Sequence, residues 1–402
     1  MSPAPGAAEL AGGVARAVAQ FTAEERAQLI TLRRALHAAP ELSWQEAGTQ
    51  RTLRAALEAA GLTDVREVAG TGLVATIPGT TPGAPVIALR GDIDALPITE
   101  ETGLPFASAH PGVMHACGHD MHATWTVAAG MLLARRPAAG AVRLVLQPAE
   151  EVGEGAARVL ASGALEGVRA IFGGHVDWRF PVGAVVATDG PIAASTDTFT
   201  VTFHGRGGHG ARPQDAIDPI VALAAFVMEV QTLVSRRLDP GWPGVVSVTV
   251  LEAGSAANVI PERGRAAGTI RATTPEARTL LCEGVRAVAS AVAALHGVRA
   301  EVTLSEGTPP LGNAPQAAGW ARAAVREVLG DAALTALPTA NMGGEDFAFY
   351  TERMPGCFLR IGTWREGRSA AGVHTPRFDP DEEALFVGGA VLAACARTAS
   401  AG

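Results

Sequence analysis

The chain has 402 residues, of which 48% are hydrophobic and 18% are charged. This composition is typical of a compact globular protein, and the length exceeds what one hydrophobic core usually supports, so two domains are predicted. The formal net charge of -8 argues against a nucleic-acid-binding protein, which needs a stripe of basic side chains.

The four cysteines show no paired spacing, which indicates free thiols in a reducing compartment. The start of the chain is rich in Ala, Gly and Pro, and this composition predicts disorder. It also lacks the basic segment and the apolar core of a signal peptide. No apolar run reaches the length of a membrane span without interruption. We therefore expect a cytoplasmic protein with neither a membrane nor a nucleic acid as its partner.

The first half of the chain has the pattern of an α/β domain. Residues 23–60 predict two helices, and residues 73–77 and 86–89 predict strands. Strands then alternate with helices to about residue 187. Such alternation is typical of a sheet that is covered by helices.

Residues 115–122 form the most informative segment. Three histidines and a cysteine fall within these eight residues, although the whole chain has only ten histidines and four cysteines. Imidazole and thiolate are ligands that borderline-soft divalent metals prefer, and an aspartate often supports a ligating histidine. The apolar stretch 123–133 predicts a helix directly afterwards, so the segment is expected in a turn at a helix start. A chance cluster or a buried structural cysteine is the alternative interpretation.

A pair of glutamates follows the predicted strand at residues 142–146. The segment 147–151 ends in Glu150 and Glu151, and α/β proteins commonly place their chemistry at the carboxyl ends of strands. Adjacent glutamates can divide the work, because one can bind a metal while the other takes a proton. Taken alone, the pair is equally well explained as an acidic surface turn.

Two further histidines complete a candidate ligand set. His175 follows the predicted strand 170–172, and His374 lies in a loop before the last predicted helix. A single histidine of this kind is more often structural than a ligand. Together, however, the side chains of suitable type number five, which exceeds the need of one tetrahedral zinc and fits two metals: Cys117, His119, Glu151, His175 and His374.

The pattern changes near residue 188, where a second domain is predicted. The elements expected there give the order βαββαβ, which is the ferredoxin-like unit: residues 196–204, 218–237, 245–251, 264–272, 275–295 and 298–304. We therefore assign residues 189–306 to an inserted domain, and residues 1–188 and 307–402 to the metal-binding domain.

A glycine-rich turn precedes His209 in the inserted domain. Glycines after a strand can cradle a phosphate, but the nucleotide-binding fingerprints require other spacing and a following lysine or acid. The glycines are better explained as letting the His209 side chain stand clear of the backbone. A solvated loop histidine is the alternative.

The order of these motifs resembles one family. The segments that carry the resemblance span nearly the whole chain: residues 34–43, 89–97, 115–122, 147–151, 205–213, 258–262, 342–347 and 374–376. They resemble the di-metal aminoacylase and carboxypeptidase clan of metallopeptidases. Within that clan they are most similar to the amidohydrolase branch with hippurate hydrolases, bacterial N-acyl-amino-acid amidohydrolases and plant auxin-conjugate hydrolases.

The resemblance implies a fold, an activity and a cofactor. The fold would be α/β, with a mixed-sheet catalytic domain of the zinc-peptidase type and an inserted ferredoxin-like domain that serves as dimerisation or lid domain. The activity would be metal-dependent hydrolysis of the amide bond of N-acyl-L-amino acids. Each subunit of a homodimer would hold two divalent ions, such as Zn, Mn, Co or Ni.

The resemblance also implies roles for single residues. The five candidate ligands match the metal ligands of the branch, Glu150 matches its general base, and His209 matches a residue that reaches the partner subunit's site and polarises the substrate carbonyl. Asn258 and Arg271 resemble groups that hold the substrate carboxylate, and Gly344 resembles a residue lining the site.

One position departs from the wider clan, which has a metal-binding histidine where this chain has Asp92. We interpret Asp92, Asp94 and Asp120 as residues that support the ligands by hydrogen bonds without binding metal.

Three other functions are the alternatives. A dipeptidase or exopeptidase of the same clan would differ only in the pocket for the acyl side. A binding protein that has lost turnover would keep the fold, but the complete ligand set together with Glu150 argues against it. A zinc nucleobase deaminase would need a Pro-Cys-x-x-Cys segment, which this sequence lacks.

Overall fold

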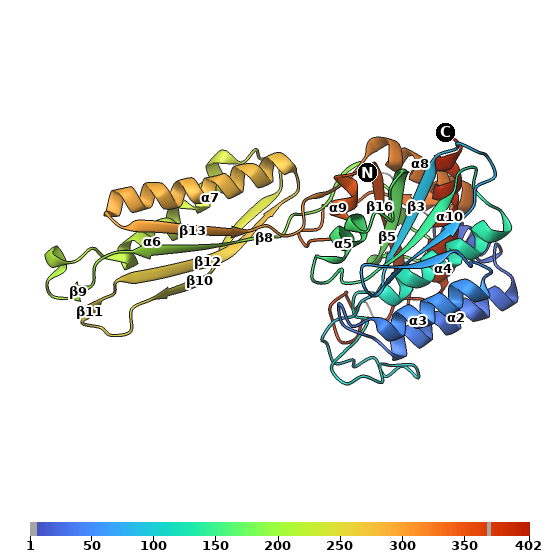
Figure 1. Cartoon of the computed structure of the whole chain (residues 1–402), viewed down its shortest axis with the longest axis horizontal. Helices are drawn as coiled ribbons and strands as arrows, with labels where there is room; N and C mark the ends of the chain where they lie inside the picture. The colour runs from blue at the N-terminus through green and yellow to red at the C-terminus, as the bar shows by residue number, and fades with distance from the viewer. Residues whose placement is uncertain (1–5, 368–370) are drawn as a thin grey trace. The chain divides into compact units, whose positions relative to one another are not determined.

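The computed structural model describes residues 6–367 and 371–402, which form two compact units (Figure 1). Of the described residues, 6–190, 313–338, 349–367 and 371–402 form the larger unit, and 191–312 and 339–348 form the smaller unit. The sequence placed the segment 339–348, which contains Gly344, in the metal-binding domain, whereas in the structure this segment belongs to the smaller unit.

The larger unit is built on a mixed eight-stranded sheet, which confirms the predicted fold class. In sheet order the strands are β1 (Val65–Val68), β2 (Gly72–Ile77), β4 (Val142–Gln147), β3 (Val86–Asp92), β5 (Val168–Pro181), β16 (Gly356–Trp364), β6 (Val185–Val186) and β15 (Leu334–Thr335). The four central strands β4, β3, β5 and β16 are parallel, whereas β2 is antiparallel to β4 and β6 to β16.

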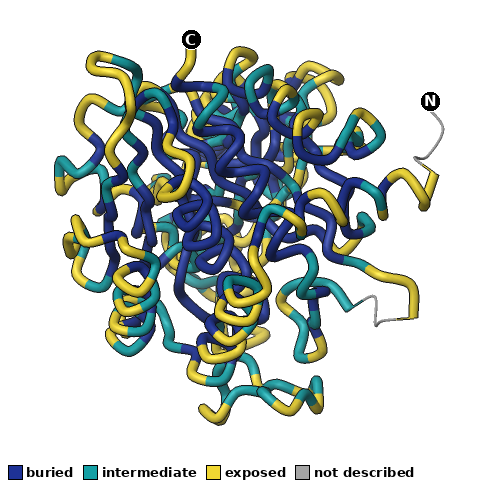
Figure 2. The backbone as a smooth tube through the Cα atoms, turned by 90° about the vertical axis from the view of Figure 1, so that its right-hand side faces the viewer, coloured by how far each residue is buried: buried dark blue, intermediate teal, exposed yellow. Residues whose placement is uncertain are grey.

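Helices cover this sheet. They are α1 (Ala7–Val18), α2 (Ala23–Ala38), α3 (Ala47–Ala59), α4 (His119–Arg135), α5 (Gly155–Ala161), α8 (Pro315–Leu329), α9 (Ala348–Thr351) and α10 (Glu383–Ser400). Helices α4 and α10 pack against each other and against β3, while α2 and α3 pack on α4. Both central helices are buried along nearly their whole length, and exposed backbone is concentrated in turns and outer helices (Figure 2).

Close packing between α4 and α10 depends on small residues. The indole of Trp125 is fully buried against Gly388, where an added Cβ would approach the ring to 2.4 Å. At the start of the chain, α1 replaces most of the predicted disorder, since Leu10 and Val14 join the core; residues 1–5 lie outside the described residues.

The smaller unit has a four-stranded antiparallel sheet in the order β10-β12-β8-β13. Its main elements are β8 (Asp197–His204), α6 (Pro219–Glu229), β10 (Gly244–Ala253), β12 (Arg263–Ala272), α7 (Pro275–His296) and β13 (Arg299–Ser305), so that the order is βαββαβ. Helices α6 and α7 lie on one face of the sheet (Figure 1) and close an apolar core with the inward side chains of β8. The predicted helix 218–237 ends as an α-helix at Glu229, and a π-helical segment, Leu233–Arg237, follows.

Short elements complete the description. The strand pairs are β9 (Gly208–His209) with β11 (Val259–Ile260), and β7 (Gly190–Ala193) with β14 (Leu311–Asn313). Single 3-10 turns occur at Pro213–Asp215 and Asp331–Ala333.

Judged only by length and composition, three helical segments are long and apolar enough to cross a membrane: Pro219–Arg237, Pro275–His296 and Glu383–Ser400. The expectation from the sequence concerned uninterrupted apolar runs, and each of these three helices contains charged residues. In the last of the three, 83% of the residues are buried inside the fold, against 33% in each of the other two. Its apolar side chains are thus used by the protein core.

Candidate metal centre

Polar side chains gather at one edge of the central sheet. Because β3, β4 and β5 are parallel, their carboxyl ends lie at the same edge. Asp94 follows β3, Glu150 and Glu151 follow β4, and His175 lies in the second half of β5. Helix α4 begins at this edge with His119 as its first residue.

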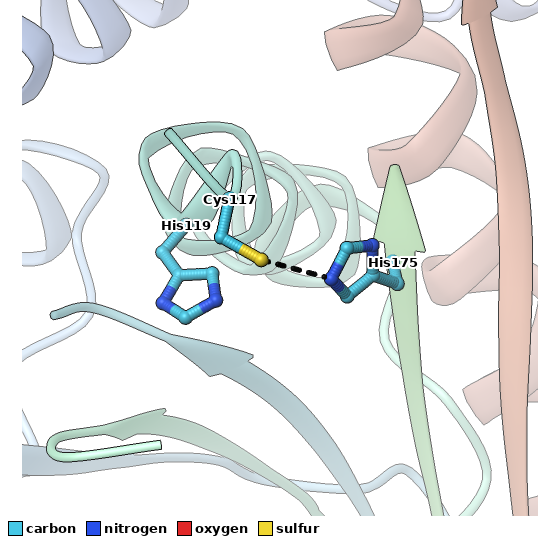
Figure 3. A group of neighbouring side chains, drawn as sticks. All are labelled: Cys117, His119 and His175. Carbon is cyan, nitrogen blue, oxygen red and sulfur yellow. Dashed lines mark hydrogen bonds between the residues drawn. The ribbon is translucent and has the colours of Figure 1, made fainter. Parts of the chain in front are cut away.

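The start of α4 is shaped by Gly118. This residue caps the helix with φ 82°, in the left-handed region that favours glycine, and an added Cβ would approach the Val176 side chain to 2.8 Å. Figure 3 shows Cys117 and His119 projecting from this turn while His175 faces them from β5. The distance from Cys117 Sγ to His175 Nε2 is 3.3 Å.

Glu151 and His374 lie on another side of Cys117. His374 Nε2 is 3.2 Å from Cys117 Sγ and 3.7 Å from Glu151 Oε1. Glu151 Oε1 is also 3.8 Å from His119 Nε2. The structure thus brings all five predicted ligand side chains together, although they come from four separate segments of the chain.

Two triplets in this cluster have the spacing of a metal site. In each of them, one possible ligand atom per residue lies within 4.8 Å of the others: Cys117, His119 and His175 in the first, and Cys117, Glu151 and His374 in the second. Cys117 belongs to both triplets.

The chemistry of the cluster fits a divalent cation. Within residues 6–367 and 371–402, the buried atoms His119 Nε2 and Glu151 Oε1 have no hydrogen-bond partner. Burial, followed by the charge of Glu151, raises the pKa of Cys117 well above its ordinary value, and burial raises the pKa of Glu151. Nitrogen, sulfur and carboxylate atoms that converge on one another are the donor set of a borderline metal ion.

Asp94 supports this cluster by hydrogen bonds. A carboxylate only accepts, so His119 Nδ1 donates to Asp94 Oδ1 at 3.1 Å and leaves Nε2 directed at the centre. The other Asp94 oxygen accepts from the Glu151 amide at 3.0 Å and from the Ser43 hydroxyl at 2.7 Å. One carboxylate therefore orients two candidate ligands, and Ser43 is a residue that the sequence analysis did not single out.

Asp92 is fully buried in an ion pair with Arg90. Burial opposes ionisation, but Arg90 and two histidines hold the pKa of Asp92 well below its ordinary value. Its Oδ1 accepts from His122 Nδ1 at 2.7 Å. His122 belongs to the histidine-rich segment 115–122, but the sequence predicted no role for it, although its position three residues after His119 places both on one face of a helix.

Asp120 differs from its expected role. It forms an ion pair with Arg33 (Nε to Oδ2, 2.9 Å) and accepts from His37 Nδ1 at 2.8 Å, while His37 Nε2 is 3.2 Å from Glu100. These partners lie away from the candidate ligands, because successive helix residues point in different directions and Asp120 faces α2 when His119 faces the strand ends. Asp120 thus ties α4 to α2 and is not seen to orient a ligand.

Glu150, the predicted base, follows a strained residue. Ala149 has φ 54°, and its amide donates to Glu46 Oε1 at 2.9 Å. Glu46 is fully buried and also accepts from the Thr71 hydroxyl at 2.6 Å. This turn places Glu150 Oε2 4.0 Å from His119 Nε2, beside the ligand cluster.

In the smaller unit the structure brings His209 and Asn258 together. His209 pairs with Val259 between the two short strands, and the Gly210 amide donates to the Asn258 carbonyl at 2.8 Å. The exposed His209 accepts from the Ala211 amide through Nδ1 at 3.1 Å. In the neutral ring the proton is therefore on Nε2, which makes this nitrogen a hydrogen-bond donor.

Arg271 and Gly344 lie at the opposite end of the smaller unit. Arg271 is eight residues along β12 from Arg263, which pairs with His204, so about 27 Å of strand separates the two ends. Gly344 packs against Thr196 at the Arg271 end. Within one chain Asn258 and Arg271 therefore cannot contact the same substrate carboxylate. The strand register that separates them was not evident from the sequence.

Comparison with known proteins agrees with this geometry. The sequence profile of peptidase family M20/M25/M40 matches residues 88–398. N-acetylcysteine deacetylase of Bacillus subtilis (strain 168) is 42% identical over 364 residues, which cover 90% of this chain and 93% of that protein. IAA-amino acid hydrolase ILR1-like 2 of Arabidopsis thaliana is 38% identical over 375 residues, or 92% of this chain and 84% of that protein.

A solved structure is similar throughout. The crystal structure of the Bacillus subtilis YXEP protein, described as a dinuclear metal binding peptidase from the M20 family, superimposes with a TM-score of 0.84 at 38% identity. The match covers 94% of this chain and 99% of that one.

Proposed function

The chain belongs to the M20/M25/M40 peptidase family and is a metal-dependent amidohydrolase, and we propose that it hydrolyses the amide bond of N-acyl-L-amino acids. The products would be a carboxylate and a free amino acid. The observation that carries this proposal is the cluster of five ligand-type side chains with Glu150 beside it. The names of two relatives, a deacetylase of N-acetylcysteine and a hydrolase of IAA-amino acids, describe substrates of this class.

We assign the metal site to five clustered side chains, which would hold the ions: Cys117, His119, Glu151, His175 and His374. Divalent zinc, manganese, cobalt or nickel all suit this donor set. When bound, such ions polarise a carbonyl and lower the pKa of water.

Glu150 is the proposed general base. Its carboxylate takes a proton from the attacking water as the new C–O bond forms, and later gives that proton to the amine nitrogen as the C–N bond breaks. Ala149 and Glu46 hold the turn that directs Glu150 into the cluster. The oxygen of the water thus stays on the new carboxylate and the amine leaves with the proton, so the reaction needs no second acid.

His209 is the proposed donor to the substrate carbonyl oxygen, through Nε2. It lies at the end of the smaller unit opposite the segments through which the chain enters and leaves that unit, near residues 191 and 312. A partner subunit is therefore proposed to deliver it. Because Asn258 lies beside His209, the partner would supply both, and Arg271 and Gly344 would come from the other subunit.

The proposed dimer would form through the smaller unit. Strand β10 is an open edge of its sheet, and an open edge invites pairing with a twofold copy. Exposed apolar side chains lie on this strand and on α6: Ile220, Val221, Met228, Val245 and Leu251. We also propose that the enzyme works in the cytoplasm.

A substrate panel tests the function. The purified protein would be assayed with N-acetyl and N-benzoyl amino acids and with unblocked dipeptides, after loading with each candidate metal. Faster hydrolysis of the N-acyl compounds is expected. Preference for dipeptides would support an exopeptidase instead, and tight binding of an N-acyl amino acid without turnover would support a binding protein.

A further inference from the structure

Strand β5 loses a neighbour just where it carries His175. Its ladder with β3 ends at the pair Arg90 and Gly173, because β3 ends at Asp92. On the other side, the ladder with β16 continues through Val176 and Asp177. In the described part of the chain no strand extends the β3 ladder, so the β3-facing polar groups of Val176 need other partners.

Two imidazoles supply those partners. The Val176 amide donates to His122 Nε2 at 3.0 Å, and the Val176 carbonyl accepts from His175 Nδ1 at 2.7 Å. Both polar groups of one residue are thus held by ring nitrogens. The two rings lie close together, with centroids 4.7 Å apart.

Each ring has one tautomer that satisfies its contacts. His122 accepts from a backbone amide through Nε2, so its proton is on Nδ1, which donates to Asp92 at 2.7 Å. His175 donates through Nδ1 to a carbonyl, so its Nε2 carries a lone pair, and this atom faces Cys117. The order of contacts runs from Asp92 through His122 and the Val176 backbone to His175.

The far end of this chain of contacts is also fixed. Arg90 forms the ion pair with Asp92 and donates to Gln147 Oε1 at 2.8 Å. Arg90, Asp92, His122 and Gln147 are each no more than 1% exposed. In such a closed environment each hydrogen bond has few alternatives, so the orientation of His122 is determined by its surroundings.

Spacing alone would allow another role for His122. Asp92, His119 and His122 also have possible ligand atoms within 4.8 Å of one another. Binding a metal through His122 Nε2, however, would remove the acceptor of the buried Val176 amide, at a cost of roughly 1–3 kcal/mol. The hydrogen bonds therefore favour a supporting role over ligation.

We propose that His122 is a positioning residue, which holds the Val176 backbone at the open edge of β5 and thereby presents His175 Nε2 to the metal centre. The inference rests on the proposed role of His175 as a ligand. His122 itself touches neither substrate nor ion.

Two substitutions separate the contacts of His122. In His122→Gln the amide oxygen reaches the place of Nε2 and can accept from Val176, while in His122→Asn the amide nitrogen takes the place of Nδ1 and can donate only to Asp92. With the proposed role, His122→Asn weakens the binding of one metal about 10- to 100-fold in chelator competition. His122→Gln stays within a few-fold of wild type. Equal behaviour of the two variants, or wild-type affinity in His122→Asn, overturns the proposal.

A measurement on the wild-type protein does not depend on how the variants fold. In ¹⁵N-labelled metal-free protein, the imidazole nitrogen signals of His122 and His175 should show both rings with the proton on Nδ1. A proton on His122 Nε2 overturns the proposal. His175→Ala tests the underlying ligand assignment separately, because retention of both metals at wild-type affinity in that variant removes His175 from the ligand set whatever His122 does.

Discussion

The ligand cluster of the larger unit and the His209 end of the smaller unit differ in how completely they are built. His119 and His175 are at most 7% exposed, and each has its Nδ1 committed to a hydrogen bond. His209 is exposed on the short strand β9, and Asn258 is exposed in the turn before β11. Hydrogen bonds within one chain thus orient His119 and His175, whereas His209 and Asn258 face solvent in a single chain.

The sharpest test within the buried region separates its two neighbouring glutamates. Glu150→Gln is expected to keep both metals and lose about 100- to 10,000-fold in kcat, because the amide does not accept the proton of the attacking water. Glu151→Gln is expected to lose metal, since Glu151 belongs to the ligand cluster. Metal analysis and steady-state kinetics of both variants provide the measurement. Loss of metal in Glu150→Gln alone would reverse the two roles.

Mixing inactive variants tests whether the exposed region is completed by a partner. His209→Ala should lose roughly 100- to 1,000-fold in kcat if His209 stabilises the oxyanion. When it is mixed with Glu150→Gln and the subunits exchange, one site of each heterodimer regains an intact Glu150 and an intact His209. Activity should return to a fraction of wild type.

The control for subunit mixing combines His209→Ala with a folded double variant that carries both Glu150→Gln and His209→Ala. No heterodimer in this mixture contains an intact His209, so no activity should return. Absence of recovery in proven heterodimers would place His209 in its own subunit's site or outside catalysis. If light scattering shows a monomer at the concentration used in the assay, and that monomer is fully active, the proposed dimer is contradicted.

Glu46 gives a smaller effect inside the buried region. Glu46→Ala leaves the buried Ala149 amide without its acceptor, so the free energy of unfolding should fall by about 1–3 kcal/mol and kcat should fall more than KM rises. Glu46→Gln keeps an oxygen for the amide and should restore most of both losses. Denaturant unfolding and kinetics measure the two effects. Equal losses in both variants would show that the negative charge of Glu46, and not its hydrogen bond, is what matters.

The sequence predicted the buried region better than the exposed one, for a physical reason. Parallel strands bring their carboxyl ends to one edge, so residues that follow strands, such as Glu151 and His175, could be placed together from the pattern alone. Orientation was harder, because the direction of Asp120 toward α2 depends on helix phase and on Arg33, a residue far away in the chain.

Long-range contacts also hid Glu46, since its partners Thr71 and Ala149 lie in other segments. In the smaller unit the separation of Asn258 from Arg271 follows from the register between β8 and β12. The strand register is set by side-chain packing over the whole sheet, so it cannot be predicted from a single motif.

The smallest effect compares two strained alanines, one in each kind of surrounding. Ala69 (φ 48°) lies in the half-buried turn between β1 and β2, and Ala149 (φ 54°) lies fully buried before Glu150. A left-handed conformation costs a non-glycine residue about 1–2 kcal/mol, part of which a glycine substitution regains against the added entropy of the unfolded chain. The free energy of unfolding of Ala69→Gly should therefore rise by up to about 1 kcal/mol, measured by heat or denaturant, while kcat and KM stay unchanged.

Ala149→Gly also loses a buried methyl group worth about 0.8 kcal/mol, so its free energy of unfolding should stay near that of the wild type. Its kcat should fall by a few-fold, because the turn that directs Glu150 becomes freer. A rise in kcat, or equal stabilisation at both positions, would show that the conformation of Ala149 is not what holds Glu150 beside the ligand cluster.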